Sequence, residues 1–214
     1  MTLLLEQYGR LPCDNGWGTQ KFSKSKHPAI DIGFLTKYGE YIPVKAWKSG
    51  KVIATGTDSA GGVYVVLRHE DVDCDWITRY WHLKKGSVVV KKGQVVKQGD
   101  KLGTRGKTGI STGTHLHFEI WKVSKSYKYK SGDASKYAVD PTKYTYIFDG
   151  QKFAQGCAFN LETKPEEAVV EVTPDEQIAK LTKELALKDK ALDTTIQVLN
   201  SAIKTIEDVQ KAVK

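Results

Sequence analysis

Two histidines in the segment His115-Leu116-His117 have the spacing that places alternate side chains on one face of a β-strand. Both imidazoles would then meet on one side of the strand, with Glu119 next in line. Such a pair could bind one metal ion, or supply one ligand and one acid–base group. An isolated His-x-His is more often two unrelated surface residues, so the motif needs support from elsewhere in the chain.

Three further histidines lie in different surroundings. His27 is followed by a proline and, four positions on, by Asp31. The proline disfavours a helix at His27, so these two side chains converge only if an extended segment bends. His82 lies in the aromatic run Tyr80–Leu83, where a hydrogen-bonded core residue is the ordinary interpretation. His69 is expected to be such a core residue.

The segments that must position these histidines have the composition of β-strands. Short β-branched runs lie between glycines at residues 50–54 and 63–67, and a strand is expected at 30–34. Residues 86–103 alternate valine runs with Lys-Gly and Gln-Gly turns, and residues 114–120 alternate again. The pattern predicts a mainly β protein, with a small antiparallel sheet as its body.

The composition of the chain changes near residue 160. All 19 glycines and all 21 aromatic residues lie at or before Phe159. We therefore expect a body over residues 1–159, and a linker over 160–175, which holds two prolines and several acids. A long amphipathic α-helix is expected over residues 176–214, after a helix-start signal at Thr173-Pro174.

Apolar residues recur every seven positions in this last segment. A second stripe is only partial, because Lys188 and Asp189 interrupt it. The pattern predicts a long helix or coiled coil that buries its stripe on the body, on a second copy or on another protein. Self-association or docking through residues 176–213 is favoured, since the segment has neither aromatics nor glycines for a compact fold. The stripe consists of Ile178, Leu185, Leu192, Leu199, Ile206 and Val213.

The net charge of +8 is unevenly distributed. Residues 1–159 hold 25 basic and 14 acidic side chains, which gives this part a charge of +11. A basic body favours an anionic partner: nucleic acid, a membrane surface or an anionic cell-wall polymer. No apolar run approaches the ~18 residues of a membrane span, and the N-terminal residues lack the pattern of a secretory signal. The three cysteines are far apart, so free thiols are expected.

Three motifs in order resemble the lysostaphin/LytM-like family of zinc metallopeptidases. They are His-x-x-x-Asp at 27–31, Tyr-x-His-Leu at 80–83 and the glycine-rich run 106–119 that ends in His-Leu-His-Phe-Glu. The resemblance covers roughly residues 27–147 and closes at Val139-Asp140-Pro141. It implies a small antiparallel β body with a narrow groove over a zinc ion, and cleavage of peptide bonds in bacterial peptidoglycan.

The resemblance also implies residue roles. His27, Asp31 and His117 match the three zinc ligands of the family, and His82 and His115 match its two catalytic histidines that do not bind the metal. Some relatives carry a tyrosine shortly before the first ligand histidine, whereas residues 21–26 of this chain contain none.

These roles agree with metal chemistry. Three protein ligands leave zinc an open position for water, whose pKa falls toward about 7 when it is bound. One further histidine can then take the proton and the other can stabilise the oxyanion or protonate the leaving amine. The sequence does not divide these tasks between His82 and His115. Glu119 is either a residue that orients a histidine or an ordinary surface glutamate.

Three alternatives compete with a zinc-dependent peptidoglycan endopeptidase. A structural or regulatory adaptor on the same fold would have a degenerate metal site, whereas all five positions are filled here. A lipoyl-like carrier and a nucleic-acid binder leave the histidines unexplained. We therefore expect no nucleic-acid partner, and attraction to anionic wall polymers. Without a signal peptide, a phage endolysin or a virion component is the expected setting, and the helical arm favours the virion.

Overall fold

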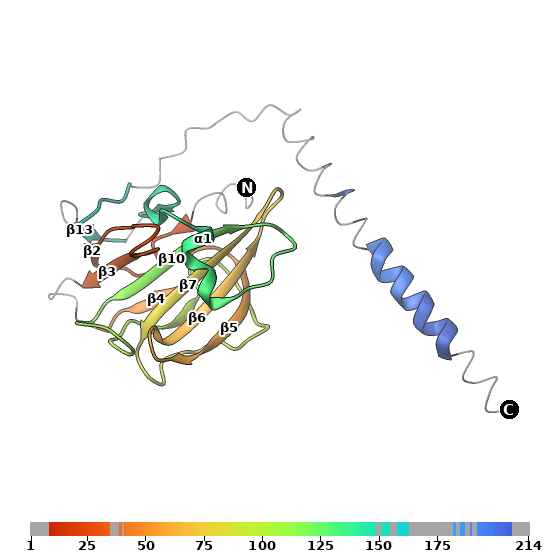
Figure 1. Ribbon diagram of the computed structural model, residues 1–214, viewed down its shortest axis with the longest axis horizontal. Coiled ribbons are helices and arrows are strands. Elements are labelled where there is room, and N and C mark those ends of the chain that lie inside the picture. The colour runs from red at the N-terminus through yellow and green to blue at the C-terminus, as the bar shows by residue number, and fades with distance from the viewer. Residues whose placement is uncertain are drawn as a thin grey trace. The chain divides into compact units, whose positions relative to one another are not determined.

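A computed structural model describes residues 9–34, 39, 41–148, 151–154, 158–162, 182, 185–186, 189 and 192–206. The chain divides into two compact units, Met1–Glu166 and Glu167–Lys214. The described part of the first unit is built mainly from antiparallel strands (Figure 1), which confirms the mainly β prediction.

The first unit is organised around one nine-stranded sheet. Its strand order is β13-β2-β3-β10-β7-β6-β5-β8, and β11 pairs with β10 off this path. Most neighbours are antiparallel, and the parallel β13–β2 pair lies at one edge. The strands are β2 (Gly16–Gln20), β3 (Ile30–Phe34), β5 (Gly50–Asp58), β6 (Gly62–Glu70), β7 (Asp75–Leu83), β8 (Val95–Val96), β10 (Leu116–Val123), β11 (Ala138–Val139) and β13 (Phe153–Ala154).

Two small sheets and three short helical turns complete the described part of this unit. Strand β1 (Gly9–Arg10) pairs in parallel with β12 (Thr145–Tyr146), and β4 (Pro43–Lys45) pairs with β9 (Lys101–Thr104). The helical turns are η2 (Ser131–Asp133), α1 (Ala134–Tyr137) and η3 (Pro141–Lys143).

The strands expected from the sequence are present, and several are longer than expected. The expected strand at 30–34 coincides with β3, while 50–54 is the first part of β5 and 63–67 lies within β6.

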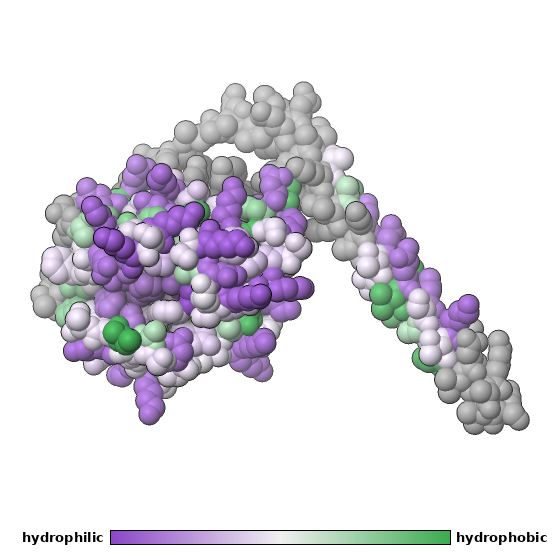
Figure 2. Space-filling model, in the orientation of Figure 1, coloured by the Kyte–Doolittle hydropathy of each residue, from purple (hydrophilic) through white to green (hydrophobic). Residues whose placement is uncertain are grey.

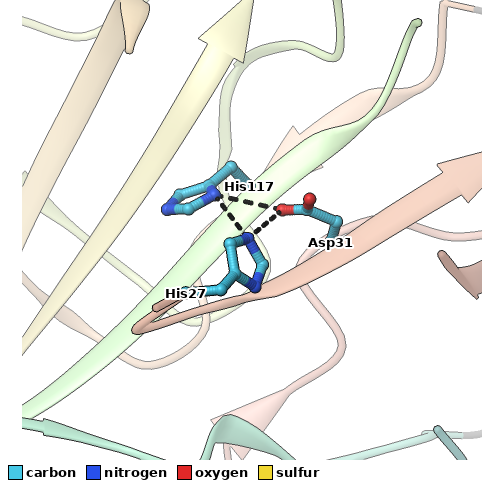
Figure 3. A group of neighbouring side chains, drawn as sticks. All are labelled: His27, Asp31 and His117. Atoms are coloured by element: carbon cyan, nitrogen blue, oxygen red, sulfur yellow. Dashed lines mark hydrogen bonds and ion pairs between the residues drawn. The ribbon is translucent and has the colours of Figure 1, made fainter. Parts of the chain in front are cut away.

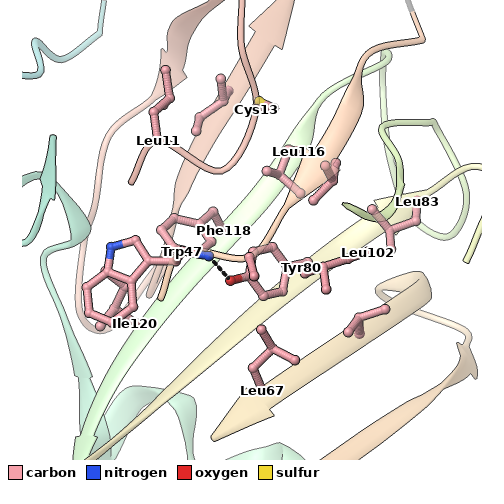
Figure 4. Close-up of a cluster of buried hydrophobic side chains, with 14 of the residues drawn as sticks. Leu11, Cys13, Trp47, Leu67, Tyr80, Leu83, Leu102, Leu116, Phe118 and Ile120 are labelled. Atoms are coloured by element: carbon pink, nitrogen blue, oxygen red, sulfur yellow. Dashed lines mark hydrogen bonds between the residues drawn. The ribbon is translucent and has the colours of Figure 1, made fainter. Parts of the chain in front are cut away.

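Alternate residues of the central strands enter two separate apolar clusters. The larger cluster (Figure 4) includes Leu67, Tyr80, Leu116, Phe118 and Ile120. The smaller cluster on the other face consists of Val66, Ile77, Trp121, Val123 and Ala138. Because strand side chains alternate, β10 presents Leu116, Phe118 and Ile120 to the main core and His117, Glu119 and Trp121 to the opposite face.

His69 is a core residue, as expected. Its Nδ1 lies 2.9 Å from the carbonyl oxygen of Ser49, and its Nε2 lies 2.8 Å from the hydroxyl of Thr78. That hydroxyl is hydrogen-bonded to the Tyr80 hydroxyl, which accepts a hydrogen bond from the backbone N–H of Trp47 (Figure 4). Burial lowers the pKa of His69 to about 4, so its ring is neutral at physiological pH.

The packing of the body continues past Phe159, where the sequence placed its end. Leu161 is buried in the main core, and the N–H of Ile147 donates to the carbonyl oxygen of Glu162 at 2.8 Å. Residues 160–162 therefore belong to the body, because a solvated linker would not bury an apolar side chain. The remainder of the expected linker and the expected helix start lie outside the described residues.

The second unit contains a helix over residues 192–206. Its apolar side chains are exposed within the described structure, and Figure 2 shows them at the surface of the helix. No helix in the described parts of the chain is long and apolar enough to cross a membrane.

Candidate metal centre

Strand pairing brings the site together. His117 of β10 lies opposite Asp31 of β3 on one side and opposite Trp81 of β7 on the other. Asp31 and His117 therefore reach the same face from neighbouring strands, although 86 positions separate them in the chain. The alternation predicted for His115-Leu116-His117 is confirmed for Leu116, which is buried in the opposite core.

His27 joins this pair from the segment that leads into β3. Two backbone hydrogen bonds between Ser23 and His27 close a tight turn there, which bends the chain as the sequence required. His27 Nε2 lies 3.1 Å from Oδ1 of Asp31, and His117 Nδ1 lies 3.0 Å from the same oxygen (Figure 3). The two ring nitrogens are 3.2 Å apart. One possible ligand atom from each residue lies within 4.8 Å of the others.

Each of these two rings has an inner nitrogen, which lies against Asp31, and an outer nitrogen, which lies on the other side of the ring. Both outer nitrogens lie next to groups that accept hydrogen bonds. His27 Nδ1 lies 3.2 Å from the carbonyl oxygen of Lys21, and His117 Nε2 lies 3.1 Å from Oε1 of Glu119. Since these oxygens accept, the outer nitrogens carry the protons, and the inner nitrogens of neutral rings present lone pairs. Two lone pairs and one carboxylate oxygen thus converge on one point. Only a positive charge satisfies all three, so the residues fit a bound cation.

In the metal-free chain this positive charge is a proton. Burial by itself would lower the pKa of His117, but the carboxylates of Asp31 and Glu119 outweigh it and raise that pKa to about 9. Burial would likewise raise the pKa of Asp31, yet the hydrogen bonds with His117 and His27 hold it well below its usual range. The carboxylate is therefore ionised, and His27, Asp31 and His117 would hold a metal ion in place of the His117 proton.

Glu119 is the residue that orients His117, which decides between the two roles left open by the sequence. It is buried, and its Oε2 accepts hydrogen bonds from Trp121 Nε1 at 2.6 Å and from Arg79 at 3.1 Å. An interior carboxylate is stable when it is paired in this way.

His82 and His115 stand beside the three-residue group. Their ring centroids are 4.7 Å apart, and the His82 ring lies 5.7 Å from that of His117. His115 Nε2 lies 3.6 Å from Oδ2 of Asp31. The structure therefore brings all five predicted residues into one cluster, with Asp31 between the histidines.

The outer nitrogens of these two rings are also fixed. His82 Nδ1 donates to the carbonyl oxygen of Thr108 at 2.8 Å, and His115 Nδ1 donates to that of Gly113 at 2.8 Å. A carbonyl oxygen only accepts, so each neutral ring keeps its Nε2 lone pair available. Burial, together with nearby His115 and His117, lowers the pKa of His82 to about 4, against the opposing effect of the Thr108 carbonyl.

His82 is held in an unusual backbone conformation. Its φ of 61° lies in the left-handed region, which residues other than glycine seldom adopt. The N–H of His82 donates to Gly61 O at 2.8 Å, and Thr108 Oγ1 donates to Leu83 O at 2.6 Å. A Cβ on Gly62 would lie 2.3 Å from the backbone of Thr108, so a glycine is needed for this close approach. Gly62 and Thr108 thus hold His82 in place.

Sequence reasoning did not single out Arg79, Trp81 or Thr108. Arg79 and Trp81 alternate with Tyr80 on β7, so they share the face of the metal group, and Trp81 stacks on His117. Arg79 lies opposite Glu119 and Trp81 lies opposite His117, and these pairs can be identified only when the pairing of β7 with β10 is known.

A mainly antiparallel β body that carries a His-Asp-His group and two adjacent histidines has the features of a metallopeptidase domain. The chain belongs to peptidase family M23, whose family model matches residues 25–133.

Known relatives agree with this membership. The peptidoglycan DD-endopeptidase ShyA of Vibrio cholerae is 42% identical over 126 residues, which are 55% of this chain and 28% of ShyA. Lysostaphin of Staphylococcus simulans is 39% identical over 77 residues, 36% of this chain and 15% of lysostaphin. The chain thus matches well under a third of the length of these relatives.

A solved structure shares the fold. The SpoIIQ–SpoIIIAH pore-forming complex contains a chain that matches with a TM-score of 0.51 and 24% identity, over 65% of this chain and 92% of that one. At this identity the likeness concerns the fold alone.

Proposed function

We propose that this protein is a zinc-dependent endopeptidase that hydrolyses peptide bonds in bacterial peptidoglycan. The observation that carries the proposal is the convergence of His27 Nε2, His117 Nδ1 and Asp31 Oδ1 on one point. The other nitrogen of each ring is hydrogen-bonded, to Lys21 and Glu119 respectively. Two nitrogens and one oxygen form a donor set that suits zinc. The family membership and the named activities of ShyA and lysostaphin support the substrate class.

Bound zinc would supply a Lewis acid and a water of lowered pKa at the open position of this site. The chain supplies the proton carriers. His82 and His115 each hold Nε2 free of a proton when neutral, because Nδ1 donates to a backbone carbonyl. One can accept a proton from the attacking water, and the other can donate a hydrogen bond or a proton once it is charged.

The protein surface favours delivery to the wall. The visible face of the body is mostly hydrophilic (Figure 2), and residues 1–159 carry a net charge of +11. We propose that this charge attracts the body to anionic wall polymers, which adds affinity without taking part in the chemistry. Such binding should weaken as salt rises, while hydrolysis of a short soluble peptide should respond much less.

Digestion of purified peptidoglycans tests the proposal. Sacculi with direct stem-peptide cross-links and sacculi with glycine bridges are incubated with the protein, and released fragments are identified by mass spectrometry. New amino termini at peptide bonds, abolished by a chelator and restored by zinc, are expected. Glycan fragments with intact peptides, or digestion that survives complete metal removal, would contradict it.

The alternative of a non-enzymatic adaptor is not favoured. An adaptor has no need of a complete His-Asp-His group with two further histidines fixed beside it. We also propose that the protein acts at the bacterial cell wall, either as an endolysin or as part of a phage virion.

A further inference from the structure

Arg79 is a buried cation next to the metal group. It lies on β7 directly opposite Glu119 of β10, and its side chain is 1% exposed. A buried arginine is stabilised by pairing of its charge and by hydrogen bonds from its donors, and in Arg79 these come from Nη1 and Nη2, since Nε has no partner among the described residues. Its contacts therefore indicate what it does in the fold.

One set of contacts leads from Arg79 to His117 by hydrogen bonds. Arg79 Nη1 donates to Oε2 of Glu119 at 3.1 Å. Trp121 Nε1 donates to the same oxygen at 2.6 Å. With Oε2 engaged twice, the other oxygen, Oε1, is directed at Nε2 of His117, 3.1 Å away. The guanidinium thus sets the orientation of the carboxylate that orients the ring.

A second set of contacts reaches His117 through aromatic stacking. The guanidinium carbon of Arg79 lies 4.0 Å from the centre of the Trp81 ring. Trp81 in turn stacks on His117, with ring centroids 5.4 Å apart and planes inclined by 23°. Arginine is suited to this double role, because its planar fork can stack on an indole while its edge donates hydrogen bonds.

We propose that Arg79 is a positioning residue for His117, which it orients at once through Glu119 and through Trp81. The hydrogen bond to Nε2 and the stack on Trp81 both restrict rotation of the ring about its Cβ–Cγ bond. Together they hold Nδ1 toward Asp31 and His27. The proposal rests on the proposed function only in taking His117 as a zinc ligand.

A purely structural role is the competing explanation. Arg79 also donates to the carbonyl oxygen of Ser131 at 3.2 Å and to its hydroxyl at 3.3 Å, so it anchors the segment that leads into α1. If anchoring were its whole role, its loss would lower stability and leave metal binding unchanged.

Arg68 provides a matched control for anchoring. It lies on the neighbouring strand β6, pairs with Asp75 at 2.7 Å, and donates to the carbonyl oxygens of Tyr127 and Lys125 at 2.8 and 2.9 Å. Among the contacts of the described residues it has none to Glu119 or to a site histidine. Arg68→Met therefore removes an arginine that ties down the same region without touching the metal group.

The experiment measures zinc affinity in the absence of substrate. Wild type, Arg79→Met, Arg79→Lys and Arg68→Met are checked for folding by circular dichroism and denaturant unfolding, and zinc is then titrated in competition with a chelating dye. Loss of a residue that orients a metal-bound histidine typically weakens binding by about 10–100-fold, so about tenfold is expected for Arg79→Met. Arg68→Met should bind zinc as wild type does, even where its stability is lower.

Arg79→Lys keeps the proposal testable if Arg79→Met does not fold. It retains the buried charge but cannot both stack on Trp81 and direct Glu119, so its zinc binding should also be weaker than that of wild type. In the double variant with Glu119→Gln, the loss of zinc-binding free energy should be smaller than the sum of the losses in the two single variants.

The outcomes separate this inference from the proposed function. Wild-type zinc affinity in the folded Arg79 variants, or an equal loss in Arg68→Met, would overturn the inference. A wild-type chain that binds no zinc would instead contradict the metal site. Zinc binding that depends on Arg79 without any digestion of peptidoglycan would contradict only the proposed activity.

Discussion

Asp31 and His117 are direct partners across the β3–β10 pair, and their side chains meet with Oδ1 3.0 Å from Nδ1. The contact is set by strand register, since a slip of one residue would turn one of them to the opposite face. The buried residues on either side of His117, Leu116 and Phe118, fix that register through the main core. The geometry of the metal group is therefore as well determined as the central sheet.

The first prediction concerns the metal. Purified protein should hold about one zinc per chain, because three protein ligands form one site. His117→Ala should lose both zinc and peptidase activity. Elemental analysis of the purified proteins measures the zinc content. A metal-free chain with full activity would rule out the proposed chemistry.

The second prediction concerns proton release. Below the pKa of about 9, His117 of the metal-free chain carries a proton that zinc must displace. Zinc binding at pH 7.5 should therefore release about one proton from this residue, and affinity should rise by up to about tenfold per pH unit toward pH 9. Calorimetry in two buffers of different ionisation heat measures the proton. An affinity that stays constant from pH 7 to 9 would show that the ring is already neutral.

Glu119→Gln supplies the control for this measurement. The change removes one of the two carboxylates that raise the pKa of His117, while Asp31 remains. Fewer protons should then be released at pH 8, where the His117 of the variant is already partly neutral.

The third prediction separates catalysis from metal binding. His82→Ala and His115→Ala should retain zinc, because neither residue is in the group of three that converges on one point. Each should lose at least about a hundredfold in rate, the usual scale of acid–base assistance. Zinc content and turnover of a soluble peptide are measured on the same samples. A variant that loses its zinc would identify the substituted histidine as a ligand.

The shared face of His115 and His117 could be predicted from their spacing in a strand, whereas the roles of His27, Asp31 and His82 were implied only by the family resemblance. His115 and His117 alternate, and the turn between Ser23 and His27 brings the first motif to them. The roles of Arg79 and Trp81 could not be predicted, since they depend on which residues of β10 lie opposite them. Each strand's apolar pattern shows which of its residues face the core, but it does not show which strand lies beside it or which residues lie opposite.

The end of the body was placed too early for a similar reason. Glycines and aromatics stop at Phe159, but Leu161 is buried and Glu162 accepts a hydrogen bond from the N–H of Ile147. Composition shows where glycines and aromatic residues end, whereas the last buried residue depends on contacts with segments that are distant in the sequence.

The fourth prediction concerns stability and His69, which lies in the core away from the metal group. Its folded pKa of about 4 is below the ordinary value of 6.5, so between these values the unfolded chain binds more protons. The folded state therefore keeps its full free energy of unfolding, as far as His69 is concerned, at pH values above 6.5. That free energy falls as the pH is lowered from 6.5 toward 4. At pH 5 this loss amounts to about 2 kcal/mol.

Urea unfolding of the metal-free protein at pH 7.5 and pH 5 measures this effect. His69→Gln removes the titrating ring, so the variant should lose less stability between the two pH values than wild type, although it is less stable at pH 7.5. An equal loss in both proteins would show that the acid sensitivity comes from other groups.

The last prediction concerns the C-terminal helix. Leu192, Ile196, Leu199, Ile203 and Ile206 are exposed, and they follow each other at alternating spacings of four and three residues. This is the spacing of the seam of a coiled coil. Isoleucine holds both a positions, 196 and 203, and leucine holds two of the three d positions, which favours a two-stranded coil. We predict that the full chain associates through this stripe, whereas a chain ending at Glu166 is monomeric, binds zinc and cleaves soluble peptide.

Light scattering over a range of concentrations tests this prediction. Leu199→Asp should reduce the full chain to the monomer, because it places a charge in the centre of the seam. Val198→Asp is the matched control: Val198 is also apolar and exposed, but it lies beside the stripe, so its variant should associate as wild type does. A wild-type chain that stays monomeric at high concentration would exclude self-association and leave the body of the same chain or a different protein as the partner of the stripe. Loss of association in both variants would point to lower helix stability rather than to the seam, since both substitutions introduce aspartate into the helix.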